Sequence, residues 1–168
     1  MRNLSPARVY MALDVAIRRA TPADEAFILR LTELLGAFPV PPWRTPAQIA
    51  RADHELLLDA LRYPTPASSL LLAEAGPGRS LGYVFTTTRQ DYFTREPHAH
   101  LEVLAVDPAA QGRGIGRALV EAAERWARDR GYRHITLNVF ARNERARALY
   151  ERLGYQPETV HYFKHLDR

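Results

Sequence analysis

Apolar residues follow two different periods along this chain, and the change between them predicts a mixed α/β fold. Helical spacing recurs in four stretches, at residues 21–35, 45–61, 115–130 and 144–153. Shorter runs between them have the length and composition of strands, at residues 15–18, 70–75, 81–88, 100–106, 134–139, 155–159 and 160–166. The expected order is βααβββαβαββ, which gives a mixed central sheet of about seven strands flanked by about four helices.

Cap and turn residues support these boundaries. Thr21-Pro22-Ala23-Asp24 and Thr45-Pro46-Ala47-Gln48 each place a threonine N-cap before a proline at the first helical position. Gly131 and Gly154 stand where the third and fourth helices should end. Gly76 to Arg79 separates two strand patterns and indicates a hairpin.

The length of 168 residues, without a linker or an internal repeat, predicts one domain. We expect residues 14–168 to form that domain and residues 1–13 to be a disordered extension, with Met11 as an alternative translation start. No apolar run reaches the ~20 residues that a membrane span needs. The N-terminus also lacks the apolar core of a secretory signal, so a cytoplasmic protein without membrane binding is expected.

Composition excludes several kinds of chemistry. The chain has no cysteine, which rules out disulfides, thiolate metal sites and an acyl-cysteine intermediate, and we expect no metal. The net charge is +4, and every basic residue except Lys164 is an arginine. These arginines are interspersed with acidic residues rather than clustered, which disfavours a nucleic-acid-binding module.

The stretch from Gln111 to Gly116 is a glycine-rich turn between an expected strand and an expected helix. Such a turn presents backbone N–H groups at the positive end of a helix, which suits phosphate oxygens. A P-loop is excluded because it needs a lysine in the turn, and Lys164 is distant. A dinucleotide fingerprint starting at Gly112 would need glycine at position 117, where Arg117 stands.

Gln111, Gly114 and Gly116 instead fit the pattern Q/R-x-x-G-x-G/A, and this turn resembles the pyrophosphate loop of the GNAT superfamily of acetyl-CoA-dependent N-acyltransferases. The segment from Leu137 to Tyr155 is similar to that family's fifth strand and fourth helix, and the resemblance spans about Val15 to Leu166. It implies the α+β GNAT fold. It also implies an N-acetyltransferase that moves acetyl from acetyl-CoA to a primary amine by direct attack in a ternary complex.

The resemblance further implies how acetyl-CoA binds. In this family the fourth strand holds the pantetheine arm through main-chain hydrogen bonds, beside a fifth strand that splays away. An amide of that strand would also face the thioester carbonyl as an oxyanion donor, worth ~3–4 kcal/mol in other systems. The residues expected to contact acetyl-CoA are Leu104, Ala105, Val106, Gln111, Gly112, Arg113, Gly114, Ile115, Gly116, Arg117 and Asn143. Without the resemblance, the strand would be an ordinary buried strand, the arginines solvated charges and Asn143 only an N-cap.

Two residues are candidates for proton transfer. Strand alternation places His100, Glu102, Leu104 and Val106 on one face, so partial burial would raise the pKa of the Glu102 carboxyl towards that of a general base. The alternative is a carboxylate paired with an arginine, and His100 on the same face is the reserve base. Tyr150 lies on the apolar stripe of the last helix and is either a core tyrosine or, as the resemblance implies, the acid that protonates the CoA thiolate.

The amine acceptor is expected near residues 38–44 and 90–98, where Trp43, Tyr92 and Phe93 offer aromatic walls and His100 lies close by. Loop packing is the alternative reading of these aromatics. The sequence does not name the acceptor, which is a small-molecule or peptide amine. Members of this family are often dimers, so a homodimer is also expected. A GNAT-fold protein that binds acyl-CoA without catalysis stays open as the alternative function.

Overall fold

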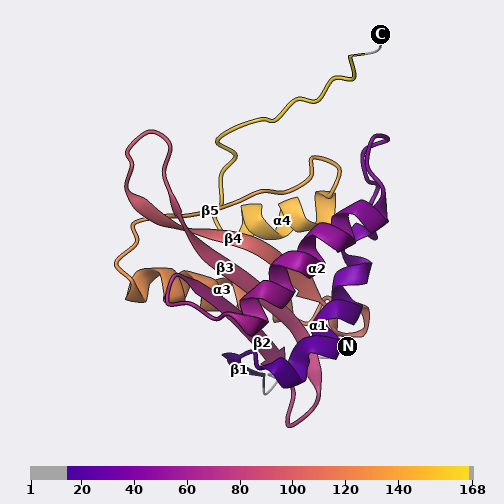
Figure 1. Cartoon of the computed structure of the whole chain (residues 1–168), viewed down its shortest axis with the longest axis vertical. Helices are drawn as coiled ribbons and strands as arrows, with labels where there is room; N and C mark the ends of the chain where they lie inside the picture. The colour runs from indigo at the N-terminus through magenta and orange to yellow at the C-terminus, as the bar shows by residue number, and fades with distance from the viewer. Residues whose placement is uncertain (1–14, 167–168) are drawn as a thin grey trace, which may run out of the picture.

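The structure is a computed structural model that describes residues 15–166, and its centre is one five-stranded mixed sheet (Figure 1). The strands lie in chain order: β1 (Ala16–Arg19), β2 (Ser68–Glu74), β3 (Ser80–Gln90), β4 (Pro97–Val106) and β5 (Ile135–Leu137). The first four pair antiparallel, and β5 pairs parallel to β4. The helices are α1 (Glu25–Thr32), α2 (Pro46–Arg62), α3 (Ile115–Asp129) and α4 (Glu144–Arg152). Three single-turn 3₁₀ segments lie at Pro22–Asp24, Glu33–Gly36 and Pro108–Ala110.

The helices form a layer on each face of the sheet. On one face, Ile28 and Leu31 of α1 and Leu57 of α2 pack with Phe85 and Val103 of the sheet. On the other face, side chains of α3 and α4 pack on a second core that includes Leu101, Ile115, Leu119, Val120 and Tyr150. The three-layer arrangement and the four predicted helices are therefore confirmed.

A β-bulge interrupts β4 at Glu102. Phe85 of β3 pairs with Val103, whereas the next residue, Thr86, pairs with Leu101, so Glu102 is an extra residue in β4. Leu101 consequently packs on the same side as Leu104, although the two residues are three positions apart. The simple alternation expected from the sequence is wrong here, because a bulge shifts the side-chain period by one residue.

The predicted sheet of seven strands is corrected to five within residues 15–166. The expected strands at 155–159 and 160–166 do not pair with the sheet, and this segment runs away from it in Figure 1. Val160 and Tyr162 are 74% and 89% exposed. The apolar residues of this segment have the pattern of a strand, but a strand also needs a neighbouring strand for its backbone groups. The segment does not pair with β5, whose three residue pairs in the described chain are all with β4. Residues 1–13, expected to be disordered, lie outside the described part of the chain.

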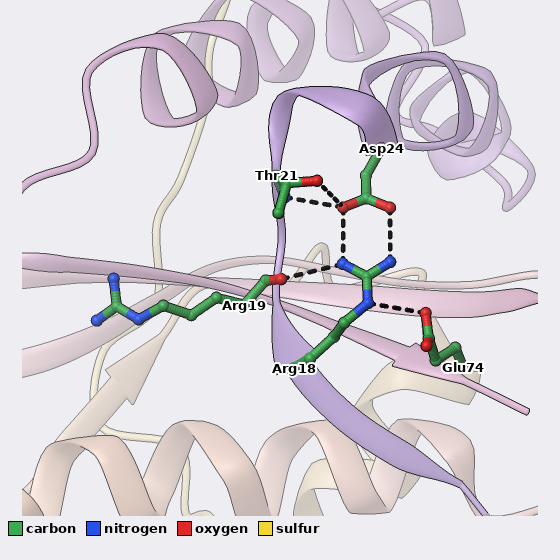
Figure 2. A network of polar contacts seen from close by, with 5 residues as sticks. All are labelled: Arg18, Arg19, Thr21, Asp24 and Glu74. Carbon is green, nitrogen blue, oxygen red and sulfur yellow. Dashed lines mark hydrogen bonds and ion pairs between the residues drawn. The ribbon is translucent and has the colours of Figure 1, made fainter. Parts of the chain in front are cut away.

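A cluster of charges joins β1 to β2 and to the turn before α1 (Figure 2). The Arg18 guanidinium donates two hydrogen bonds of 2.8 Å to the two oxygens of Asp24, and its Nε donates to Glu74 at 2.8 Å. Asp24 also accepts from the backbone N–H of Thr21 at 2.8 Å. Thr21 therefore caps the 3₁₀ turn before α1 rather than α1 itself, whereas the sequence predicted one continuous helix. The bond to Arg18 lowers the pKa of the Asp24 carboxyl from 3.8 to about 2.

Among the described helices, none combines the length and the apolar character that crossing a bilayer requires.

Candidate functional site

The sheet opens between β4 and β5. Their pairing is limited to three contacts, from Ala99 with Ile135 to Leu101 with Leu137. Beyond Leu101, β4 continues to Val106 without a β5 residue beside it in the described chain. Apart from the Val106 carbonyl, which Gln111 binds, backbone N–H and C=O groups on that edge of β4 are therefore available to an extended ligand. The cofactor residues predicted on this strand, Leu104 to Val106, all lie on the open stretch.

The glycine-rich turn follows directly, at the N-terminus of α3. Gly112 and Gly114 have φ angles of +76° and +82°, a region that residues with a Cβ rarely adopt. The first hydrogen bond of α3 runs from the Ala118 N–H to the Gly114 carbonyl. The N–H groups of Ile115 to Arg117 therefore stand free of intrahelical partners at the positive end of the helix, as an anion site requires.

Neighbouring side chains fix the shape of this turn. Gln111 donates from Nε2 to the Val106 carbonyl at 3.2 Å. Arg145 in turn donates a hydrogen bond to Oε1 of Gln111. A Cβ on Gly116 would lie 3.3 Å from a methyl carbon of Leu149, so glycine allows α3 to approach α4 closely. The turn predicted from sequence is thus joined to both the open strand and the last helix.

The arginines of the turn are exposed. Arg117 forms an ion pair of 2.8 Å with Glu121, and Arg113 lies at the surface. Arg113 lies in the turn and Arg117 directly follows it, and the contact of either with a phosphate stays a prediction. Asn143 caps α4 by accepting the Ala146 N–H at 3.2 Å. This confirms its predicted capping role, while its role towards CoA stays a prediction.

Tyr150 is buried on α4, with 8% of its surface exposed, in the core beneath the open sheet. Burial raises the pKa of its phenol to about 12, so the hydroxyl keeps its proton at neutral pH. Its ring centre lies 5.7 Å from that of Tyr155. The residue therefore packs as the core reading expects, and it also carries a proton that it could donate.

Glu102 is held by three hydrogen bonds. Arg89 donates to both carboxylate oxygens at 3.0 and 2.6 Å, and the Thr87 hydroxyl donates at 2.6 Å. This is the arginine-paired carboxylate that the sequence analysis kept as the alternative. The bulge also separates Glu102 from Leu104 and Val106, which pack with the α3–α4 core, so the predicted common face is corrected.

His100 lies beside this carboxylate and is 5% exposed. Its Nδ1 is 2.7 Å from the Thr136 hydroxyl, and its Nε2 is 4.0 Å from Glu102. Burial, followed by the nearby Arg89 charge, lowers the pKa of the imidazole to about 4. The ring is therefore neutral at physiological pH, and a base with so low a pKa accepts a proton weakly.

Asp53 of α2 is a titratable group that the sequence analysis missed. Burial is the main cause that raises the pKa of its carboxyl to about 6; the charge of His54 opposes this rise, and the charge of Glu102 adds a smaller increase. A signal was present in the sequence: Asp53 lies three residues after Ala50 and four before Leu57, on the buried stripe of α2. A carboxylate at a buried position is a functional-site candidate.

The aromatic residues expected around the acceptor are not brought together. Tyr92 and Phe93 lie at the turn between β3 and β4 and are each 76% exposed. Trp43 lies in the loop before α2, where it stacks on Phe163 with ring centres 4.8 Å apart. Figure 1 shows the β3–β4 turn and this loop at opposite sides of the molecule. The stacking on Phe163 is the loop packing that was the alternative reading of Trp43.

This chain is similar to known proteins in both sequence and fold. The profile of the Acetyltransferase (GNAT) family matches residues 28–155. An aminoglycoside N(6′)-acetyltransferase type 1 of Stenotrophomonas maltophilia is 32% identical over 152 residues, which cover 88% of this chain and 91% of that protein. A mycothiol acetyltransferase of Beutenbergia cavernae is 54% identical over 59 residues, which are 35% of this chain.

The match to the Beutenbergia cavernae mycothiol acetyltransferase spans only 20% of the length of that protein. Among solved structures, AAC(6′)-Iy in complex with the bisubstrate analogue CoA-S-monomethyl-acetylneamine superposes with a TM-score of 0.66. It is 22% identical in sequence, and the match covers 91% of this chain and 99% of that one. At that identity the likeness supports the fold.

Proposed function

The chain belongs to the GNAT family of acetyltransferases, and from this membership we propose that it transfers an acetyl group from acetyl-CoA to a primary amine in a ternary complex. The observation that carries the proposal is the coincidence of two features. The edge of β4 is open beyond Leu101, and the glycine turn with its free N–H groups lies at the end of the same strand. One extended thioester with a diphosphate would use both.

The turn and the strand divide the binding of acetyl-CoA between them. The N–H groups of Ile115 to Arg117 face the diphosphate, where the helix dipole favours negative charge. Backbone groups of Leu104 to Val106 hold the pantetheine arm, and one N–H donates to the thioester oxygen as charge develops there. Gln111 keeps the strand and the turn in register through its bond to Val106.

Proton transfer requires a base for the amine. The acceptor arrives as an ammonium ion and loses one proton before attack. Its nitrogen then bonds to the acetyl carbon, and as the carbon–sulfur bond breaks it loses a second proton to solvent, which leaves a neutral amide. Glu102 is our proposed proton acceptor, with Arg89 fixing its orientation. Asp53, whose carboxyl pKa of about 6 is close to neutral, is the proposed partner that takes the proton onward, directly or through water.

The departing CoA thiolate also needs a proton. We assign this to Tyr150, which is protonated at neutral pH and lies on α4 beside the residues that pack under the turn. Its raised pKa keeps the phenol from ionising before the thiolate forms. A free thiolate, whose thiol has an ordinary pKa of about 8.5, is a weaker base than this phenolate, so we place the proton transfer in the same step as carbon–sulfur cleavage.

For the acceptor we propose an amine of an amino sugar. The support is the Stenotrophomonas maltophilia relative, whose match covers most of both proteins. That relative is named as an aminoglycoside N(6′)-acetyltransferase. The AAC(6′)-Iy structure of the same fold contains an analogue that joins CoA to acetylneamine. That this chain forms a homodimer, as expected from the family, also stays a prediction.

A free-thiol release assay with acetyl-CoA tests the proposal. We expect release with an aminoglycoside that carries a 6′ amine and little release with its matched analogue that carries a 6′ hydroxyl. Glu102→Gln should lower kcat/KM by about 100-fold or more, because it removes proton acceptance but keeps the shape. Binding of CoA without thiol release from any amine would contradict the proposal and favour the non-catalytic alternative.

A further inference from the structure

Three potential metal ligands meet where the β3–β4 hairpin approaches the start of β5. Asp91 follows β3, His98 is the second residue of β4, and His134 immediately precedes β5. One donor atom from each lies within 4.8 Å of the other two. Asp91 and His98 belong to the same hairpin, whereas His134 comes from a distant part of the sequence, and no step of the proposed acetyl transfer uses them.

His98 provides an independent reason to expect a ligand. Its side chain is 6% exposed, and its Nε2 lies 3.1 Å from the Thr136 hydroxyl. Its second nitrogen, Nδ1, is buried and forms no hydrogen bond of good geometry within the described chain; the Glu96 backbone lies close enough to raise the pKa of the imidazole slightly, but the bond is poorly formed. Buried polar atoms are nearly always paired, so a buried nitrogen without a well-formed bond calls for an explanation. Burial, followed by the His134 charge, lowers the pKa of this imidazole, which therefore offers a lone pair at neutral pH.

Asp91 is held ready by the hairpin turn. Its Oδ1 accepts hydrogen bonds from the backbone N–H groups of Phe93 at 2.9 Å and Thr94 at 2.7 Å, and from the Thr94 hydroxyl at 3.1 Å. The other oxygen, Oδ2, faces Nε2 of His134 at 3.9 Å. One carboxylate oxygen therefore fixes the side chain while the other points to the histidines.

We propose that Asp91, His98 and His134 bind a zinc ion. Two imidazole nitrogens and one carboxylate oxygen form a common ligand set for zinc, with water at a fourth position. In the zinc-bound state His98 would donate from Nε2 to the Thr136 hydroxyl and bind the ion through Nδ1, as zinc-bound histidines with an outer-shell partner do. Besides His134 and Asp91, the charged group that acts on His98 is Arg89, which is paired with Glu102.

Binding requires a short movement of the exposed ligand. Zinc bonds of about 2.0–2.2 Å place tetrahedral donors roughly 3.4 Å apart, closer than the present 4.8 Å limit. The rings of His98 and His134 now lie nearly parallel, at 21°, with centres 4.8 Å apart. His134 has a side chain 40% exposed, so it can turn its nitrogen towards the other two donors. The ion would then join the hairpin to the edge strand β5.

Calorimetric titration of the untagged, chelator-treated full chain with zinc chloride tests this site. We expect one saturable site per chain. Asp91→Asn keeps an oxygen for the turn amides but removes the charge, and His134→Ala removes an exposed ligand. Each should weaken zinc binding by at least about 10-fold. His161→Ala, the same change at an exposed histidine elsewhere, is the matched control and should bind zinc as the wild type does.

Cobalt(II) serves as a second probe that does not depend on the variants. A tetrahedral site of nitrogen and oxygen ligands gives visible absorption bands, which zinc should displace at one equivalent. Zinc should also raise the unfolding temperature of the wild type but not that of His134→Ala. The proposal is overturned if the wild type shows no saturable one-to-one binding, or if His134→Ala binds zinc as tightly as the wild type.

Discussion

The ion pair between Arg18 and Asp24 makes stability depend on pH in a way that one substitution can test. The pair joins β1 to the turn before α1, and Glu74 of β2 accepts the third bond of the same guanidinium (Figure 2). Asp24→Asn keeps the size of the side chain and its contact with Thr21 but removes the negative charge. Arg18 would then lose its stronger partner.

The magnitude follows from the carboxyl pKa. A decrease from 3.8 to about 2 corresponds to about 2 kcal/mol of native-state stabilisation. The Arg18 side chain is 36% exposed, so solvent screening lowers the expected value to about 1–2 kcal/mol. Because the folded pKa lies below the unfolded pKa, this stabilisation is complete above about pH 5. It is lost as the pH falls towards about 2.

Urea unfolding of the wild type and Asp24→Asn at several pH values measures the effect. The wild type should be the more stable protein by about 1–2 kcal/mol at pH 7. The difference should shrink steadily between pH 5 and pH 2. Asp59→Asn, at an exposed aspartate of α2, controls for the change in net charge. Equal stability at pH 7, or a difference that does not depend on pH, would refute the reasoning.

Three further predictions concern the site. Tyr150→Phe should reduce kcat by about 100-fold or more while CoA affinity in calorimetry changes little, and unchanged turnover would remove the tyrosine from the mechanism. Asp53→Asn should stabilise the protein at pH 8, because the folded pKa of about 6 lies above the unfolded 3.8 and ionisation opposes folding above that range. The gain should vanish below about pH 4, and a gain that persists there would show another cause. Gly114→Ala should weaken CoA binding, whereas Gly76→Ala, with a similar φ of +86° in a distant hairpin, should lose similar stability but bind CoA normally.

The sequence predicted the helices and the glycine turn well because their signals are local. Thr45 caps α2 through the predicted box with Gln48, and Gly114 adopts the positive φ that the turn needs. Each signal lies within a few residues of the structure that it specifies. The predicted strand at 100–106 was likewise found, although β4 begins earlier, at Pro97.

The parts that the sequence did not predict depend on distant neighbours. The bulge at Glu102 is visible only in the pairing with β3, and it decides which side chains share a face. The pairing of Arg89 with Glu102 follows from the same register. The segment 155–166 shows the converse, because its pattern suits a strand but the described chain provides no edge beside it. The position of Asp53 on the buried stripe of α2 was readable from the sequence, but its proximity to Glu102 of β4 was not.

Because Glu102 is the extra residue at the bulge in β4, the packing of this strand does not depend on it. In a regular strand, deleting one residue would turn all later side chains to the opposite side. Here Leu101 and Leu104 already pack together, so a chain without Glu102 would bring them to the two-residue spacing of an uninterrupted strand. The protein could therefore lose its carboxylate in one step and keep the same buried surface. Deletion of Glu102 would thus leave Leu101 and Leu104 on the same face of β4.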